Sequence, residues 1–222
     1  RAQATQGRDS RHGSARRLLP RCVRLTINRM AITYPLSPPS PFRASRLSFT
    51  GVSSVSRNLS PFTMQVQQYN WPGQAWMGSV ECPPMVRADA EAVISFLLAA
   101  HRGTFYFQDY SNPTNRGGVT GTLTVTTATA NSSTLTFSGA TGSFALGDWL
   151  QISTSLYKVV QVNSSSSVEV FPVLRSSYAA STPITYANAK GVFRLASPQT
   201  EWSIDLASIY GVSFSIMEDV AT

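Results

Sequence analysis

Most of the chain alternates between apolar and polar residues with a period of two, which is the pattern of β-strands that bury one face. A clear example begins with Phe62, Met64 and Val66, each of which is followed by a polar residue. The Trp-Pro-Gly sequence at 71–73 indicates a turn, and a returning strand is predicted over 76–82. We therefore expect a hairpin that reverses direction at 71–73.

The segment before this hairpin, residues 35–61, is rich in Pro and Ser. Proline lacks the N–H that a central strand donates, so it is tolerated mainly at sheet edges and in turns. We expect this segment to form an extended arm with short edge strands.

One segment has the 3.6-residue period of an amphipathic helix, which is predicted to span about 87–102. Gly103 is expected to end the helix, because glycine adopts the positive φ that follows many helices without a Cβ clash. The longest apolar run of the chain, 92–100, is too short to cross a bilayer, so no membrane-spanning segment is expected. The expected apolar face consists of Ala90, Val93, Ile94, Leu97, Leu98 and His101.

The opposite face of this helix carries the small residues Ala92, Ser95 and Ala99. Small side chains allow another subunit to approach closely, which makes these three residues a candidate subunit interface. Alanine also forms helices well on a solvated surface, and this second explanation stays open.

Between 117 and 190 the composition shifts to Thr, Ser, Ala and Gly, and the helical pattern disappears. Six short apolar segments separated by polar turns predict a small antiparallel barrel or sandwich. These segments are 123–125, 135–137, 150–152, 156–162, 168–173 and 184–186.

The last residues, 191–222, return to longer alternating strands that need partners. Because the insert is self-contained, the partners are expected among the strands before Tyr110. The predicted fold class is therefore mainly β. A split β-barrel or sandwich domain, 30–116 with 191–222, contains the helix and carries an inserted β-barrel domain, 117–190.

The basic charge is confined to the first residues of the chain. Residues 1–29 hold eight of the 18 Lys and Arg residues and one acid, so they carry a net charge of +7, whereas 30–222 are neutral. We favour an upstream-extended reading frame with Met30 as the true start. A nucleic-acid-binding arm and a transit peptide are the alternatives, and all three predict disorder over 1–29.

The chain offers little catalytic or metal-binding chemistry. Cys22 and Cys82 have no partner at the spacing of a zinc or redox motif. His101 lies on the expected apolar face of the helix, where a lone histidine is more often a packed residue than a base. The acids are scattered singly, and Glu218 with Asp219 is interpreted as a solvated chain end. We therefore expect no enzyme activity, no metal and no cofactor.

The tryptophans are candidate ligand-facing or packing residues. Aromatic faces stack on the apolar faces of sugars, whereas core packing and subunit contacts are the commoner use of tryptophan. Both uses stay open for Trp71, Trp76, Trp149 and Trp202.

An ordered series of short sequence segments carries a resemblance to a known family. These segments are MAITYPLS, SPFTMQVQQYNWPGQAW, PPMVRADAEAVISFL, FYFQDYSNP, GDWLQISTSLYKVVQV, VFPVLR and KGVFRLASPQTEWSIDLASIYGVSFSIMED. Together they resemble the distal tail proteins of bacteriophages and prophages with long non-contractile tails. The resemblance covers nearly all of residues 30–222 and begins at Met30.

The resemblance implies a structural virion protein, assembled in the host cytoplasm, that forms a ring at the distal end of the tail tube. Such rings are typically hexamers and join the tail tube protein to the hub proteins of the tail tip or baseplate. In this chain the split domain would be the ring-forming belt, and 117–190 would be a peripheral domain. DNA and the tape-measure protein would pass through the ring without specific binding. The alternative is a carbohydrate or host-surface binding module of a phage tail, with its site on the insert.

Overall fold

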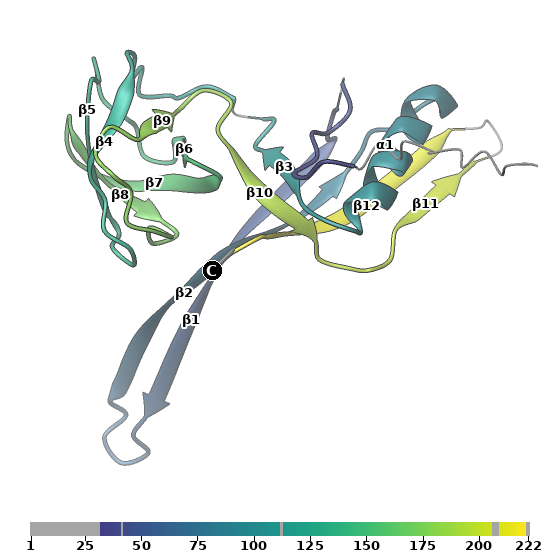
Figure 1. Cartoon of the computed structure of the whole chain (residues 1–222). Coiled ribbons are helices and arrows are strands. Elements are labelled where there is room, and N and C mark those ends of the chain that lie inside the picture. Colours follow the sequence, from purple (N-terminus) through teal and green to yellow (C-terminus); the bar gives the residue numbers. More distant parts are fainter. Residues whose placement is uncertain (1–31, 41, 112, 206–208, 221–222) are drawn as a thin grey trace, which may run out of the picture. The chain divides into compact units, whose positions relative to one another are not determined.

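Twelve strands and one helix make up the described part of a computed structural model of the chain, residues 32–40, 42–111, 113–205 and 209–220 (Figure 1). The basic segment 1–29 and Cys22 lie outside the described residues, so the predictions made for them are not addressed by the structure.

Six strands form one antiparallel sheet in the order β1-β2-β12-β10-β3, with β11 paired to β12. The late strands pair with the early ones as the pattern indicates, β12 with β2 and β10 with β3. The strands of this sheet are β1 (Arg46–Leu59), β2 (Val66–Glu81), β3 (Phe105–Gln108), β10 (Lys190–Leu195), β11 (Glu201–Ile204) and β12 (Tyr210–Glu218).

The other six strands close into an antiparallel barrel in the order β4-β5-β8-β7-β6-β9. Each of them coincides with one of the six apolar segments predicted within the insert. They are β4 (Leu123–Thr127), β5 (Thr134–Ser138), β6 (Trp149–Ile152), β7 (Ser155–Ser164), β8 (Ser167–Phe171) and β9 (Pro183–Thr185). The predicted fold class is confirmed, because the protein is mainly β with one helix, a small closed barrel and a second sheet.

Strands β1 and β2 are long, and residues 52–75 form a two-stranded arm (Figure 1). Within the described residues, β12 pairs with β2 only from Met77 to Glu81, so the arm is paired only to itself. The chain reverses at 60–65, where the N–H of Ser60 donates to the carbonyl oxygen of Gln65 over 2.9 Å.

The turn predicted at 71–73 is therefore wrong. These residues fall in a register shift between the Ser53–Gln74 and Val55–Asn70 pairs, so the strand continues past them. Proline is tolerated in such an irregularity because no ladder hydrogen bond is required of it there.

Helix α1 (Arg87–Ala100) packs on the sheet, and its buried stripe differs from the predicted one at its border. Leu98 is 51% exposed and His101 is exposed at the C-terminal cap. Phe96 and Ala100 are buried instead, and the Phe96 ring lies 5.5 Å from that of Phe105. The residues that the helix buries are Ala90, Val93, Ile94, Phe96, Leu97 and Ala100.

Gly103 follows the helix as predicted, but for a different reason. Its φ is not positive. A Cβ at this position would lie 2.4 Å from the Cδ1 atom of Tyr34, so the glycine admits the tyrosine ring. The Tyr34 hydroxyl donates a hydrogen bond of 2.9 Å to the carbonyl oxygen of Ala99, which ties the segment before β1 to the end of the helix.

Two hydrophobic clusters hold these parts together. One fills the barrel. The other lies between α1 and the sheet, and it also includes Trp149 and Leu156, which belong to barrel strands. Two strands of the barrel thus contribute side chains to the core of the sheet, which packs the barrel against it.

Candidate functional site

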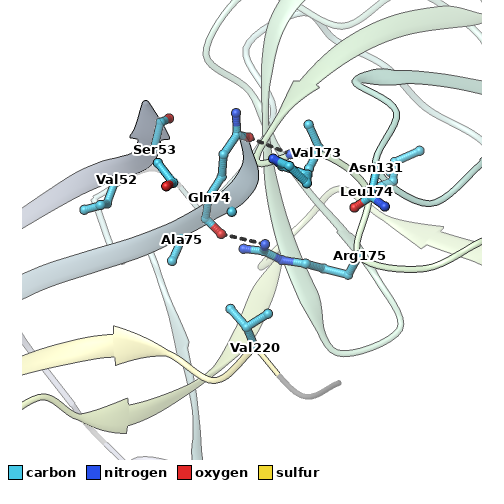
Figure 2. Close-up of a pocket in the computed structure, with 12 residues that line it drawn as sticks. Val52, Ser53, Gln74, Ala75, Asn131, Val173, Leu174, Arg175 and Val220 are labelled. Atoms are coloured by element: carbon cyan, nitrogen blue, oxygen red, sulfur yellow. Dashed lines mark hydrogen bonds between the residues drawn. The ribbon is translucent and has the colours of Figure 1, made fainter. Parts of the chain in front are cut away.

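A pocket of about 690 Å³ lies where the base of the arm meets the barrel (Figure 2). We call it the base pocket. Most of its lining is apolar or small, and its one charged residue is Arg175. It is lined by Val52, Ser53, Ser54, Pro72, Gly73, Gln74, Ala75, Asn131, Val173, Leu174, Arg175 and Val220.

Gln74 joins the arm to the barrel with both its side chain and its backbone (Figure 2). The N–H of Val173 donates to Oε1 of Gln74 over 2.8 Å. Nη1 of Arg175 donates to the carbonyl oxygen of Gln74 over 2.6 Å. Two walls of the base pocket are therefore fixed to each other by hydrogen bonds.

Arg175 also forms a buried ion pair with Glu218, the last residue of β12. Nη2 of Arg175 lies 2.6 Å from Oε2 of Glu218, and the two side chains are only 12% and 4% exposed. The same Oε2 accepts the backbone N–H of Trp76 over 3.0 Å. The interpretation of Glu218 as part of a solvated chain end is wrong, because β12 carries it inward beside the barrel.

Burial raises the pKa of Glu218 above its ordinary value of 4.5, although Arg175 and the N–H of Trp76 each favour the ionised form. The guanidinium is not fully satisfied either, since its Nε is buried without a hydrogen-bond partner among the described residues. A buried pair of this kind fixes geometry strongly but adds little net stability.

Two of the four predicted tryptophans lie beneath this junction. Trp76 and Trp149 are each 5% exposed, and their rings are 5.1 Å apart. Nε1 of Trp76 donates to the carbonyl oxygen of Leu156, and Nε1 of Trp149 donates to Oδ2 of Asp109. Both tryptophans therefore pack and join the barrel to the sheet.

The other two tryptophans are exposed, and the four do not form one platform. Trp202 is 43% exposed on β11. Trp71 is 52% exposed on the arm, where its ring stands edge to face against that of Tyr69 at 4.7 Å.

The arm exposes large apolar side chains on both faces and at its tip. Phe62 is 93% exposed and Met64 is 73% exposed in the turn. Leu59, Val66 and Tyr69 are each more than half exposed along the strands. The alternation of Phe62, Met64 and Val66 predicts a strand with one buried face, so this exposed surface does not follow from the sequence pattern.

The small residues of the helix do not all lie on one open face. Ala92 and Ser95 are exposed, whereas Ala99 is half-buried beside Tyr34. Their assignment to a subunit interface stays a prediction.

Reactive groups are few in the described part of the chain. Cys82 is a free, buried thiol whose pKa burial raises to about 11. Within the described ranges, no three His, Cys, Asp or Glu residues lie together as a metal site would require. Over the same ranges, no helix combines the length and the apolar character that crossing a bilayer requires.

No protein-family model matches the chain, and no curated protein is significantly similar to it. What the geometry offers is a mainly β protein with an exposed apolar arm, a pocket at the base of that arm, and a buried polar junction to a small barrel.

Proposed function

We propose that this chain is a non-enzymatic structural subunit of a ring at the distal end of a phage tail tube. Six copies would join the tail tube protein to the hub proteins of the tail tip, within a tail assembled in the host cytoplasm. The resemblance of residues 30–222 to distal tail proteins supports this proposal.

The observation that carries the proposal is the exposed arm. Within the described residues, the arm pairs only to itself, and a two-stranded hairpin is marginally stable in water without further packing. Large apolar side chains gathered on a surface mark sites of association. An element with these properties is suited to burial against another molecule in an assembly.

The charge balance is consistent with a conduit. Residues 30–222 have no net charge, so the body offers no overall attraction for nucleic acid. DNA and the tape-measure protein would pass such a ring without specific binding.

Light scattering of the purified 222-residue chain, combined with negative-stain images, tests this function. We expect particles of about six subunits with a central hole. A chain that remains monomeric at high concentration, both alone and when mixed with the tail tube protein, would contradict the proposal.

A second candidate is a sugar-binding module of the phage tail, and the exposed pair of Tyr69 and Trp71 favours a site for it on the arm instead of on the insert. Aromatic rings at a surface stack on sugars. Saturable binding to host envelope glycans by the monomer, lost on Trp71→Ala, would support this candidate against the ring.

A further inference from the structure

The tip of the arm is a built structure with an apolar side chain at its end. The N–H of Ser60 donates to the carbonyl oxygen of Gln65 over 2.9 Å. The N–H of Met64 donates to the carbonyl oxygen of Ser60 over 3.0 Å. These bonds close the turn and leave Phe62 93% exposed. An aromatic side chain presented in this way, with only two side-chain torsions to fix, is suited to anchor an interface.

The chemistry of the tip points to a neutral protein surface as its partner. Residues 58–73 contain no charged side chain. Phosphate groups of nucleic acid and anionic lipid headgroups are bound mainly through Lys and Arg, which this stretch lacks.

The base pocket is a surface of the required kind. It has a volume of about 690 Å³ and is lined by apolar residues that include Val52, Pro72, Ala75 and Val220. Its one cation, Arg175, is neutralised by the carboxylate of Glu218 at 2.6 Å. Its walls are also held in place before any partner arrives, which lowers the entropic cost of binding.

Tip and pocket cannot meet within one molecule, because they lie at opposite ends of the same hairpin. The six steps along the strand from Ser53 to Leu59 alone span about 20 Å when extended. A surface patch and its complement at different places on one chain make a head-to-tail contact between copies, and repetition of such a contact closes into a ring when the rotation allows it.

We propose that the arm tip of one copy inserts into the base pocket of the next copy, with Phe62 as the anchor. This inference rests on the proposed ring and names the contact that builds it. The pocket between arm and barrel is then the receptor for the neighbouring arm, and each copy both gives and receives one tip.

Two variants separate the halves of the contact. Phe62→Asp places a charge on the tip, and Val220→Trp fills the pocket at a residue that is already 46% exposed. Each should weaken association about 30-fold or more per contact, as loss of an interface anchor does. The matched controls are Thr63→Asp, beside Phe62 in the same turn, and Val160→Trp, at an exposed position of β7 outside the pocket. Circular dichroism and thermal unfolding verify that all four variants fold.

Mixing the two variants tests whether the contact is head-to-tail. The Phe62→Asp chain keeps its pocket and the Val220→Trp chain keeps its tip, so the mixture has one competent contact. We expect a one-to-one complex by light scattering, with no rings, although neither variant associates alone. Rings formed by Phe62→Asp alone, or no complex in the mixture, would overturn the inference.

The outcomes distinguish this inference from the function on which it rests. If the unaltered chain forms rings and both variants also form them, the ring stands and the tip-to-pocket contact is wrong. If the unaltered chain forms no ring, alone or with the tail tube protein, the proposed function fails first. Binding of the unaltered monomer to phosphatidylcholine vesicles, abolished by Phe62→Asp, would assign the tip to a membrane and overturn the inference.

Discussion

Arg175 and Glu218 are the residues on which the junction between barrel and sheet depends. Together they join three segments: the stretch after β8 that carries Arg175, the base of the arm at Gln74 and Trp76, and the end of β12 that carries Glu218. Removing one partner of a buried ion pair lowers the stability of the fold strongly, because the other charge stays buried and unpaired.

Arg175→Met should destabilise the protein by about 3–5 kcal/mol, because it leaves the Glu218 carboxylate buried without its cation. Urea unfolding followed by tryptophan fluorescence measures this change at neutral pH. The matched control is Arg194→Met, because the side chain of Arg194 is 60% exposed in its pair with Asp219. This control should cost about 0–1 kcal/mol. Equal losses of unfolding free energy for the two variants would show that burial gives the Arg175 pair no greater effect on stability than an exposed pair has.

The raised pKa of Glu218 gives stability a definite pH dependence. The folded state holds the proton more tightly than the unfolded state, so the contribution of this group is fully present below pH 4.5 and is lost as pH rises through the folded-state value. The difference in unfolding free energy between the unaltered chain and Glu218→Gln should therefore decrease as pH rises from 4 to 8. Urea titrations across this range check the sign, and a difference that grows with pH would contradict it.

The burial of Glu218 and its pairing with Arg175 cannot be predicted from the sequence, for a physical reason. Glu218 and Asp219 are adjacent, yet the period of a strand sends their side chains to opposite sides, and only the partner of β12 decides which one is buried. Arg175 follows a barrel strand without any local motif. Contacts separated by 43 residues leave no pattern in a window of ten.

The sequence pattern also predicts helix α1 only in part. Its existence, its approximate bounds and four of its six buried residues follow from a period of 3.6. The border of its buried stripe does not, because Phe96 turns toward Phe105 and leaves Leu98 outside. Sequence alone therefore places Leu97 and Leu98 on the same face, whereas the structure separates them.

Leu97 and Leu98 form a matched pair for a stability measurement. Leu97 is fully buried, so Leu97→Ala should cost about 2–5 kcal/mol, through lost burial and the cavity left behind. Leu98 is 51% exposed, and Leu98→Ala should change stability by no more than about 0.5 kcal/mol. Thermal unfolding of both variants measures the contrast. A large loss of stability for Leu98→Ala would contradict this and would support the apolar face predicted from the sequence.

The arm is the element that the sequence least reveals. Strand propensity identifies the two strands of the arm. An alternating pattern normally means that a strand buries one face, whereas both faces of the arm are exposed in the single chain. The position of the turn was also misplaced, since Pro72 and Gly73 are tolerated in a bulge as well as in a turn. The six barrel strands, by contrast, are separated by clear polar turns and were all predicted.

At the scale of the whole molecule, folding and assembly should be separable. Replacing residues 58–67 by Asn-Gly joins the paired residues Arg57 and Gln68 through a two-residue hairpin loop. The segment removed lies outside both hydrophobic cores, so the melting temperature of the monomer should change by only a few degrees. Light scattering should show loss of the ring. Rings formed by the shortened chain would assign assembly to another surface.

The connection between sheet and barrel has a consequence for how such a protein can change over time. The chain leaves the sheet at Gln108 and returns at Lys190, and these two residues are direct neighbours in the β3–β10 ladder. An insertion at such a point requires no adjustment of strand register elsewhere. The barrel can therefore be exchanged for another module while the sheet persists, provided that the replacement supplies three side chains: an aromatic and an aliphatic one where Trp149 and Leu156 now complete the core of the sheet, and a cation for Glu218 where Arg175 now lies. The paired ends of β3 and β10 would then be a site at which one inserted domain can replace another, as long as the new domain preserves these contacts with the sheet.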